Sequence, residues 1–326
     1  MSEPAVISED RIRILCPGGL VSGGAELLHQ LAGSLRARGL DAAIVYTPLG
    51  STFTTPVEYG RYQCKVAHTV PDEKGVAAIA PEVGTLELAR FKHACHVVWW
   101  LSVDNYSGRL GTPAGWKMIV RRWLFSDIPR PETTVHLFQS EYARDFVRKR
   151  FGAGGEMLSD YLAAEYLQAP IQGVRRPAVA YNPRKGQAFT RQLMQACPGV
   201  KFVPLENMTR DQLRATLDTC MVYVDFGHHP GKDRIPREAA VRGAVVIVGR
   251  TGSAAVMQDV PLPERYKFAP RADSLPALRG LIEEVFLNFD EHARAQQPYR
   301  NAIAAEPAAF ESQLDRVFGR GTANRP

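Results

Sequence analysis

Two adjacent basic residues, Arg184 and Lys185, stand where cations can do chemistry. They follow the apolar run 178–181, which predicts a β-strand, and they precede a predicted helix over 187–196. In parallel sheets, ligands bind at the carboxyl ends of strands, so both side chains would face a crevice. There they could hold a diphosphate and stabilise the charge on a departing phosphate oxygen. A solvated basic turn is the alternative, and the position directly after a strand favours the functional interpretation.

A second polar segment, 227–240, follows the predicted strand 221–226 and leads into a predicted helix over 236–242. Its basic-type side chains are His228, His229, Lys232, Arg234 and Arg237. Pro236 suits the first turn of a helix, where a missing N–H costs nothing. Glu238 would lie in the same turn, where the helix dipole favours a carboxylate that could accept hydrogen bonds from two ribose hydroxyls. An acid that only stabilises the helix dipole is the simpler alternative.

The adjacent histidines, His228 and His229, raise the question of a metal site. Neighbouring side chains in an extended segment point to opposite faces, and no spaced Asp, Glu or His is evident that would complete a ligand set. We therefore expect no bound metal. Roles as a base, as a hydrogen-bond donor or in loop packing stay open for both residues.

A glycine-rich turn, 17–24, lies between a predicted strand over 12–16 and a predicted helix over 25–38, and it contains Gly23 and Gly24. Glycine permits close backbone approach, and a helix N-terminus points free N–H groups outward, so an anion or a sugar could dock there. The turn lacks the GK[ST] ending of a P-loop and the GxGxxG spacing of a dinucleotide site, which disfavours nucleotide kinases and NAD-type dehydrogenases. A tight turn without a ligand is the alternative.

Another turn of small residues, 249–254, follows the apolar run 244–248 and contains Gly252 and Ser253. Its backbone can approach a phosphate or a sugar for the same reason. A plain turn at the end of a strand is the alternative.

Short apolar runs alternate with amphipathic stretches along the chain, which is typical of βα units around parallel sheets. The predicted strands are 12–16, 42–46, 96–101, 135–138, 178–181, 201–204, 221–226 and 244–248. The predicted helices are 25–38, 141–151 after a cap at Ser140, 187–196, 210–219 after a capping box from Thr209 to Gln212, and 236–242. Residues 168–177 predict a linker between two halves, and 274–318 predict helices with breaks near Pro298 and Pro307.

Composition and length set the wider frame. The 326 residues are 45% hydrophobic and 23% charged, an ordinary globular balance whose length suggests roughly two domains. The net charge of +6 suits anionic ligands but is too mild to identify nucleic acid as a partner. The sequence contains neither a signal-peptide pattern at its start nor a run near the roughly 18 apolar residues of a membrane span. Five scattered cysteines without a CxxC pair predict a reducing, cytoplasmic setting, and contact with the inner face of a membrane stays open.

Several of these segments together resemble bacterial glycosyltransferases of the GT-B fold, nearest to the GT4-like (glycosyltransferase group 1) enzymes of polysaccharide and cell-surface synthesis. The segments, which span most of 12–268, are PGGLVSGGAELLHQLAGSLRARG, HVVWWLSVDNY, FQSEYARDFV, YNPRKG and DFGHHPGKDRIPREAAVRGAVVIVGRTGSA. The resemblance implies an α/β protein with two Rossmann-like lobes facing each other across a cleft. It implies an acceptor-side lobe over 1–170, a nucleotide-sugar-binding lobe over 171–285, and a helical tail over 286–326 that packs back on the first lobe.

The resemblance also implies an activity and roles for residues. It implies a metal-independent hexosyl- or related transferase without a cofactor, which moves sugar from a nucleotide-sugar donor to a glycan or other hydroxyl acceptor. Arg184 and Lys185 would bind the diphosphate, and Glu238 would hold the ribose. Gly23 and Gly24 would face the donor phosphates or the acceptor across the cleft.

The resemblance implies roles for two further residues, and at one position this chain differs from the family pattern. Gly252 and Ser253 would lie near the phosphate or the transferred sugar. The usual pattern has another glutamate eight positions before the ribose-binding one, where this chain has Pro230. The role of that glutamate near the sugar would be absent or would fall to His228, His229, Lys232 or Asp233.

Competing interpretations remain. Pro230 in place of an acid is also what a degenerate homologue would show, one that binds a nucleotide or glycan without transferring sugar. Transfer to a nucleic-acid base is a third interpretation, suggested only by the net charge. In each case the basic residues expected around one crevice are Arg184, Lys185, Lys232, Arg234 and Arg237.

Overall fold

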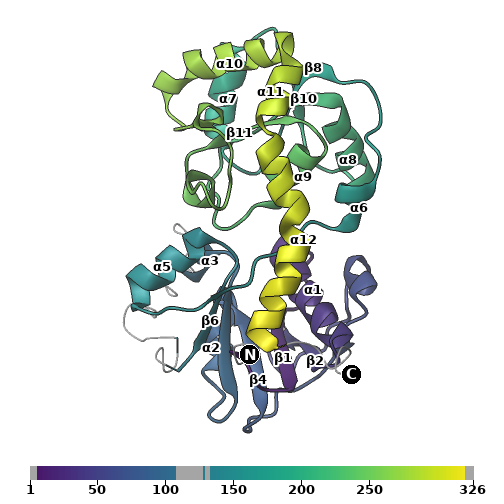
Figure 1. The fold of residues 1–326 in the computed structure, drawn as a ribbon, viewed down its shortest axis with the longest axis vertical. Coiled ribbons are helices and arrows are strands. Elements are labelled where there is room, and N and C mark those ends of the chain that lie inside the picture. The colour runs from purple at the N-terminus through teal and green to yellow at the C-terminus, as the bar shows by residue number, and fades with distance from the viewer. Residues whose placement is uncertain (1–5, 108–127, 129–132, 320–326) are drawn as a thin grey trace. The chain divides into compact units, whose positions relative to one another are not determined.

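The computed structural model of the protein (Figure 1) describes residues 6–107, 128 and 133–319. The chain divides into two compact units. The first unit comprises Met1–Asp160 together with Ala308–Pro326, and the second comprises Tyr161–Pro307. The expected division ends the first lobe at residue 170 and has a tail over 286–326 that packs back on that lobe, whereas here the first unit ends at Asp160 and takes in the chain again from Ala308.

A parallel sheet forms the centre of the first unit. Its described strands are β1 (Arg11–Pro17), β2 (Asp41–Thr47), β3 (Lys65–Val66), β4 (Val76–Pro81), β5 (Cys95–Trp100), β6 (Val135–Phe138) and β7 (Glu156–Met157). They lie in the order β3-β2-β1-β4-β5-β6-β7, and each neighbouring pair is parallel. The predictions of β1, β2, β5 and β6 are confirmed to within one residue at each end.

Strand β4 is an element that the sequence patterns do not predict. Its sequence, VAAIAP, is rich in alanine and has no alternation of polar and apolar residues. All six residues are nevertheless buried, because β4 lies between β1 and β5 inside the sheet.

Helices connect the strands of the first unit. Helix α1 (Gly23–Ala37) begins two residues earlier than predicted, because Ser22 caps it and its Oγ accepts a hydrogen bond from the backbone N of Ala25 at 3.3 Å. Helix α5 (Glu141–Phe151) confirms the predicted cap, since Ser140 Oγ accepts a hydrogen bond from Ala143 N at 3.1 Å. The other described helices of this unit are η1 (Val57–Tyr62), η2 (Glu82–Gly84), α2 (Thr85–Leu88) and α3 (Val103–Ser107).

The second unit has its own parallel sheet. Its described strands are β8 (Arg176–Tyr181), β9 (Lys201–Pro204), β10 (Cys220–Asp225), β11 (Val245–Gly249) and β12 (Lys267–Phe268). They lie in the order β12-β11-β10-β8-β9, again all parallel. Alternate residues of β11 belong to different apolar clusters, with Val246 and Val248 on one face and Val245 and Ile247 on the other. The sheet is therefore covered on both faces, as in a doubly wound fold.

Helices surround this second sheet. They are α6 (Ala164–Gln168), α7 (Gln187–Ala196), α8 (Arg210–Thr219), α9 (Arg234–Val241), η3 (Gly252–Ala255), η4 (Glu264–Tyr266), η5 (Ala272–Ser274), α10 (Leu275–Leu287), α11 (Phe289–Ala295) and the first part of α12 (Gln297–Phe318), whose residues from Ala308 on belong to the first unit. The predicted capping box of α8 is confirmed, because Thr209 and Gln212 each bond the other's backbone N–H, at 2.9 and 3.2 Å.

The C-terminal helices correct one prediction. Helix α12, drawn in yellow in Figure 1, begins next to Pro298 as expected but continues through Pro307 without a break. Proline removes one helical hydrogen bond, yet Ile303 and Phe310, on either side of it, are almost wholly buried. Burial of these apolar side chains offsets the lost bond, so local propensity does not decide the outcome here.

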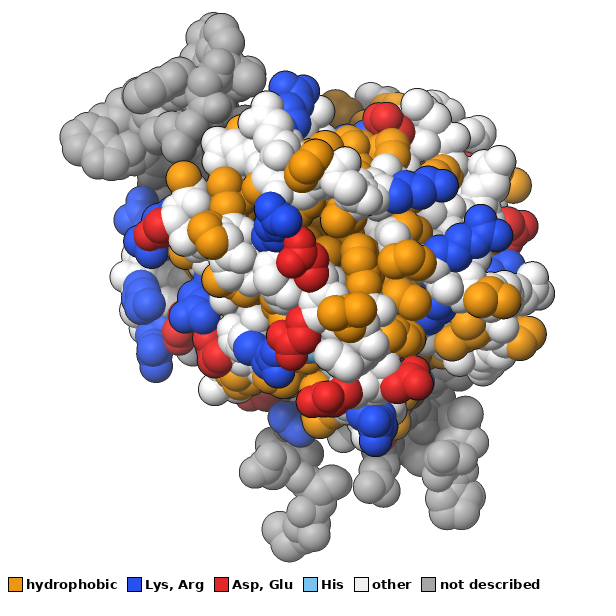
Figure 2. All heavy atoms as spheres, turned by 90° about the horizontal axis from the view of Figure 1, so that it is seen from above, with side chains coloured by type: hydrophobic (Ala, Val, Ile, Leu, Met, Phe, Trp, Pro, Cys, Tyr) orange, Lys and Arg blue, Asp and Glu red, His pale blue; other side chains and the backbone are white. Residues whose placement is uncertain are grey.

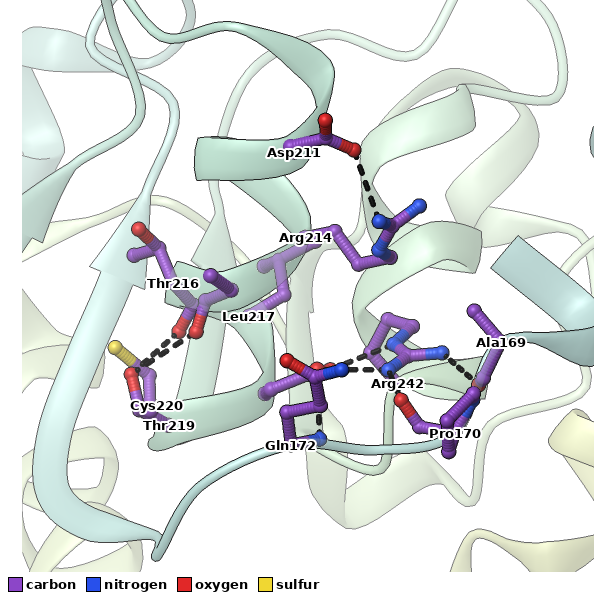
Figure 3. A network of polar contacts seen from close by, with 12 residues as sticks. Ala169, Pro170, Gln172, Asp211, Arg214, Thr216, Leu217, Thr219, Cys220 and Arg242 are labelled. Carbon is purple, nitrogen blue, oxygen red and sulfur yellow. Dashed lines mark hydrogen bonds and ion pairs between the residues drawn. The ribbon is translucent and has the colours of Figure 1, made fainter. Parts of the chain in front are cut away.

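The segment expected as a linker, 168–177, is held by a buried ion pair of the second unit. Arg242 donates to Asp218 at 2.6 Å, and its other nitrogens donate to the carbonyls of Ala169 and Pro170 at 2.6 and 2.8 Å (Figure 3). The backbone N of Gln172 donates to Asp218 at 3.0 Å. The start of the segment is therefore fastened to the ends of α8 and α9.

The boundary between the units falls earlier for a related reason. Leu162 and Tyr166 belong to the apolar core of the second unit, so the chain enters that unit before α6. The expected boundary at residue 170 rests on the proline and glycine content of 168–177. That content gives no information about whether the residues before it pack in the core of the second unit.

Candidate functional site

Three loops meet at the carboxyl edge of the second sheet. They follow β8, β10 and β11, which are neighbours in that sheet, so their carboxyl ends share one edge. Glycines allow the loops to touch backbone to backbone. A Cβ on Gly186 would overlap the carbonyl of Phe226, and a Cβ on Gly252 would overlap the carbonyl of His229. Both glycines have positive φ, at 59° and 57°, which side-chain-bearing residues rarely adopt.

We predict that Gly252→Ala destabilises the second unit by about 1–3 kcal/mol or more, because it combines backbone strain with this overlap. Chemical denaturation followed by circular dichroism measures the change. Gly199→Ala is the matched control, since a Cβ there meets nothing within 4 Å. Equal stability of the two variants would contradict the close packing of the loops after β10 and β11.

Arg184 is an exposed cation at this edge. Its backbone N donates to Asn182 Oδ1 at 3.0 Å, which shapes the loop after β8. Within the described part of the chain, its guanidinium makes neither an ion pair nor a hydrogen bond, and the residue is exposed. The guanidinium is thus open to solvent, which fits both the predicted contact with a diphosphate and the alternative of a solvated basic turn.

Lys185, beside it, is engaged inside the protein. Its Nζ lies 2.5 Å from Asp233 Oδ2, and the same oxygen lies 3.1 Å from His229 Nδ1. On the other side of the ring, His229 Nε2 lies 3.7 Å from Asp225 Oδ1. Asp225 also accepts hydrogen bonds from the Tyr223 hydroxyl at 3.1 Å and from a backbone N–H. The result is a chain of polar groups that runs from the interior of the sheet to its edge.

This arrangement corrects the view that His229 has no spaced acidic partner. Asp225 and Asp233 flank it at intervals of four residues, and Asp225 and His229 are buried. Asp225 closes the otherwise apolar strand β10, and a single acid at the end of such a strand is a signal that the sequence does contain. Burial raises the pKa of Asp225, and it raises the pKa of the adjoining Tyr223 well above its ordinary range.

The same three residues form the group best placed to hold a metal ion among the described residues. Ligand atoms of Asp225, His229 and Asp233 lie within 4.8 Å of one another, and their oxygen and nitrogen donors would suit a divalent transition metal. Lys185 opposes that use, because its ammonium already occupies Asp233 and would repel a cation. The geometry therefore favours an ion-paired network over a metal centre.

Glu238 does not lie where it was predicted. Helix α9 begins at Arg234, two residues earlier than expected, so Glu238 lies beyond the first turn. Its carboxylate is almost fully buried and accepts two hydrogen bonds from Arg234, at 2.8 and 3.2 Å. The prediction that Glu238 lies in the first turn of the helix is therefore wrong, and its partner is Arg234 rather than the helix dipole, whereas its role in holding a ribose stays a prediction.

Lys232 and Arg237, which were expected to face a ligand, form ion pairs with a glutamate of α12. No sequence pattern identifies this glutamate as their partner. Glu306 of α12 lies 2.7 Å from Lys232 Nζ and 2.8 Å from Arg237 Nη1. Arg237 also donates to the backbone carbonyls of Lys232 and Asp233, and only 2% of it is exposed. Arg237 therefore holds the loop in front of α9 rather than facing a ligand.

The remaining predicted residues of the second unit divide by exposure. His228 is exposed whereas His229 is buried, as neighbours in an extended segment can be. Ser253 is fully buried, where its hydroxyl donates to the Gly231 carbonyl at 2.5 Å and its backbone N donates to the His229 carbonyl at 2.9 Å. Its hydroxyl thus fastens the loop after β10.

Gly23 and Gly24 belong to the first unit, where they open helix α1. The turn before them is fixed by Tyr59, whose hydroxyl accepts from Ser22 N at 2.8 Å and donates to Ser22 O at 3.0 Å. No sequence motif marks this tyrosine.

The surface shows no concentration of one charge on the face drawn in Figure 2, where the described basic and acidic side chains are interspersed. Near the carboxyl edge of the second sheet, Lys185, Lys232, Arg234 and Arg237 are each paired with a carboxylate. The expected basic crevice is therefore largely neutralised. A search of the described helices finds none with the length and hydropathy needed to cross a membrane.

The chain is similar to known proteins in its fold but not detectably in its sequence. No family model matches the chain, and no curated protein matches its sequence significantly. Among solved structures, sucrose-phosphate synthase from Thermosynechococcus elongatus is 13% identical, with a TM-score of 0.63 over 94% of this chain and 98% of that one. Anabaena Alr3699/HepE in complex with UDP-glucose is 13% identical, with a TM-score of 0.63 over 93% and 98%. An α-glucosyltransferase in complex with UDP and a 13-mer DNA is 11% identical, with a TM-score of 0.57 over 94% and 99%.

These similarities cover nearly the whole of each chain and agree with the parallel sheet found in each unit and with the C-terminal helices. The protein therefore has the GT-B fold.

Proposed function

We propose that this protein is a glycosyltransferase that moves a sugar from a nucleotide-sugar donor to an acceptor hydroxyl. The observation that carries the proposal is Arg184, an exposed and unpaired guanidinium within the described part of the chain, next to Lys185 at the carboxyl edge of a parallel sheet. In a doubly wound fold this edge is where ligands bind, and two adjacent cations match a diphosphate. Because a fold by itself does not determine an activity, the proposal depends on these residues.

The proposed chemistry is electrostatic. Arg184 and Lys185 would stabilise the negative charge that grows on the nucleoside diphosphate as the bond to the sugar breaks. The cations would serve in place of a metal ion at the diphosphate, so we propose metal-independent transfer. GT4-like membership, a role in polysaccharide synthesis and a cytoplasmic location, with contact at the inner face of a membrane, belong to the same proposal. Alr3699/HepE in complex with UDP-glucose makes UDP-sugars the first donors to test.

A thermal-shift screen tests donor binding. The full-length protein is heated with UDP, GDP, CMP, ADP or dTDP, and one of these is expected to raise the unfolding temperature. A ligand at 100 times its Kd stabilises the native state by about 2.7 kcal/mol. If no nucleotide shifts the transition, the proposal of a nucleotide-sugar site fails.

A second candidate is a degenerate homologue that binds a nucleotide or glycan without transfer. Two observations favour it: Pro230 replaces the acid of the usual pattern, and Glu238 is buried against Arg234. UDP binding without any release of UDP from UDP-glucose, across varied acceptors, would select this candidate. Transfer to a nucleic-acid base ranks lower, because most cations at the edge are already paired with acids.

A further inference from the structure

The polar chain behind Lys185 becomes more buried with each step inward. Side-chain exposure is 32% at Lys185 and 20% at Asp233 but 1% at both His229 and Asp225. Tyr223, the innermost member, is fully buried. Each member is oriented by the one behind it: the Tyr223 hydroxyl fixes Asp225, and His229 lies between Asp225 and Asp233.

We propose that Asp225, His229 and Asp233 are positioning residues that hold the ammonium of Lys185 in place for an anionic ligand. A free lysine side chain samples many rotamers, and ordering it when a ligand binds costs entropy. Asp233 orders it beforehand, and the buried His229–Asp225 pair orders Asp233. This inference rests on the proposed function for the identity of the ligand, a nucleoside diphosphate, but not for the interaction itself.

The geometry separates this role from a catalytic one. Both ring nitrogens of His229 face carboxylates, and the ring is almost wholly buried, so it acts through Asp233 rather than on a substrate. His229 Nε2 makes no hydrogen bond in the described part of the chain and stands 3.7 Å from Asp225 Oδ1. The contact on the Nδ1 side, at 3.1 Å, is therefore the tighter one and the one that reaches Lys185.

Lysine acetylation in the ligand-free, full-length protein tests the interaction directly. The Lys185 ammonium lies 2.5 Å from Asp233 Oδ2 and its side chain is only 32% exposed, so acetic anhydride can reach it only after this contact breaks, and Lys185 should react more slowly than an exposed lysine. In His229→Ala and Asp233→Asn its acetylation rate, followed by mass spectrometry, should rise several-fold relative to exposed Lys149. In His229→Asn the amide can donate where Nδ1 does, and the rate should stay near that of the native protein.

A matched control is Asp211→Asn, which removes the carboxylate of the Asp211–Arg214 ion pair in the same unit and should leave the reactivity of Lys185 unchanged. Unchanged Lys185 reactivity in Asp233→Asn, or failure of His229→Asn to restore the rate, would overturn the positioning role. Because Asp233 is partly exposed, its variant tests the idea even if His229→Ala fails to fold.

Calorimetric titration with UDP separates this proposal from the proposed function. His229→Ala should weaken UDP binding about tenfold, the effect of losing one hydrogen bond to a charged group, and His229→Asn should restore it. If His229→Ala binds UDP as tightly as the native protein does, the positioning role fails and the proposed function stands. If the native protein binds no nucleotide, the proposed function fails, and the acetylation rates still decide the positioning role.

Discussion

Replacing Arg184 with alanine is expected to lower the turnover of the nucleotide-sugar donor by about 10²–10³-fold. Arg184 is exposed and free of ion pairs in the described part of the chain, so its loss removes an interaction with ligand and leaves the fold intact. The leaving diphosphate gains negative charge as the glycosidic bond breaks, so the guanidinium matters more in the transition state than in the bound donor. The loss should therefore appear mainly in kcat, with a smaller rise in KM.

UDP release from UDP-glucose, followed with and without a panel of hydroxyl acceptors, measures the effect. Arg191→Ala is the matched control, because Arg191 is an exposed arginine on the adjoining helix α7. Arg184→Lys keeps the charge but loses the planar fork that matches a phosphate, and it should recover only part of the rate. Near-native turnover in Arg184→Ala would remove this residue from the proposed site.

Replacing Arg242 with alanine should destabilise the second unit by about 3–5 kcal/mol. The side chains of Arg242 and Asp218 are 1% and 2% exposed, so removing the arginine leaves a buried carboxylate without its charge partner. The change also frees the carbonyls of Ala169 and Pro170, which Arg242 binds in Figure 3.

Two probes can assign the loss to the correct unit. All four tryptophans lie within residues 1–160, so tryptophan fluorescence follows the first unit, whereas circular dichroism follows both. In Arg242→Ala the dichroism transition should move to lower denaturant while the fluorescence transition moves less. Arg214→Ala breaks the partly exposed pair with Asp211, also in Figure 3, and should cost only about 0–1 kcal/mol. Equal losses in the two arginine variants would show that burial of the Arg242 pair is unimportant.

Local patterns predict much of this fold because many elements are fixed by short-range features. Ser140 caps α5, and Thr209 with Gln212 closes a capping box, and both signals lie within four residues of the helix they start. Strand β4 could not be predicted in this way, since its burial comes from the neighbours β1 and β5 and not from its own alternation. Pro307 shows the reverse case, where tertiary packing outweighs a strong local signal.

The candidate site was predictable in position but not in its electrostatics. Arg184 and Lys185 could be placed at a strand end from the sequence around them. Glu306, in contrast, is separated from Arg237 by 69 residues, and no pattern in one sequence pairs them. Counting cations therefore predicts a basic crevice, whereas the fold brings a carboxylate to most of them.

Residues 308–326 belong to the first unit, and this affects the order in which the two units can fold during synthesis. Leu314 and Val317 are fully buried, Ile7 N donates to the Val317 carbonyl, and Gln313 accepts from the backbone of Ser159. The ribosome makes these residues only after the entire second unit. The N-terminal unit, although translated first, must therefore wait for the last part of the chain to complete its core, and the second unit is the one that can finish folding earlier.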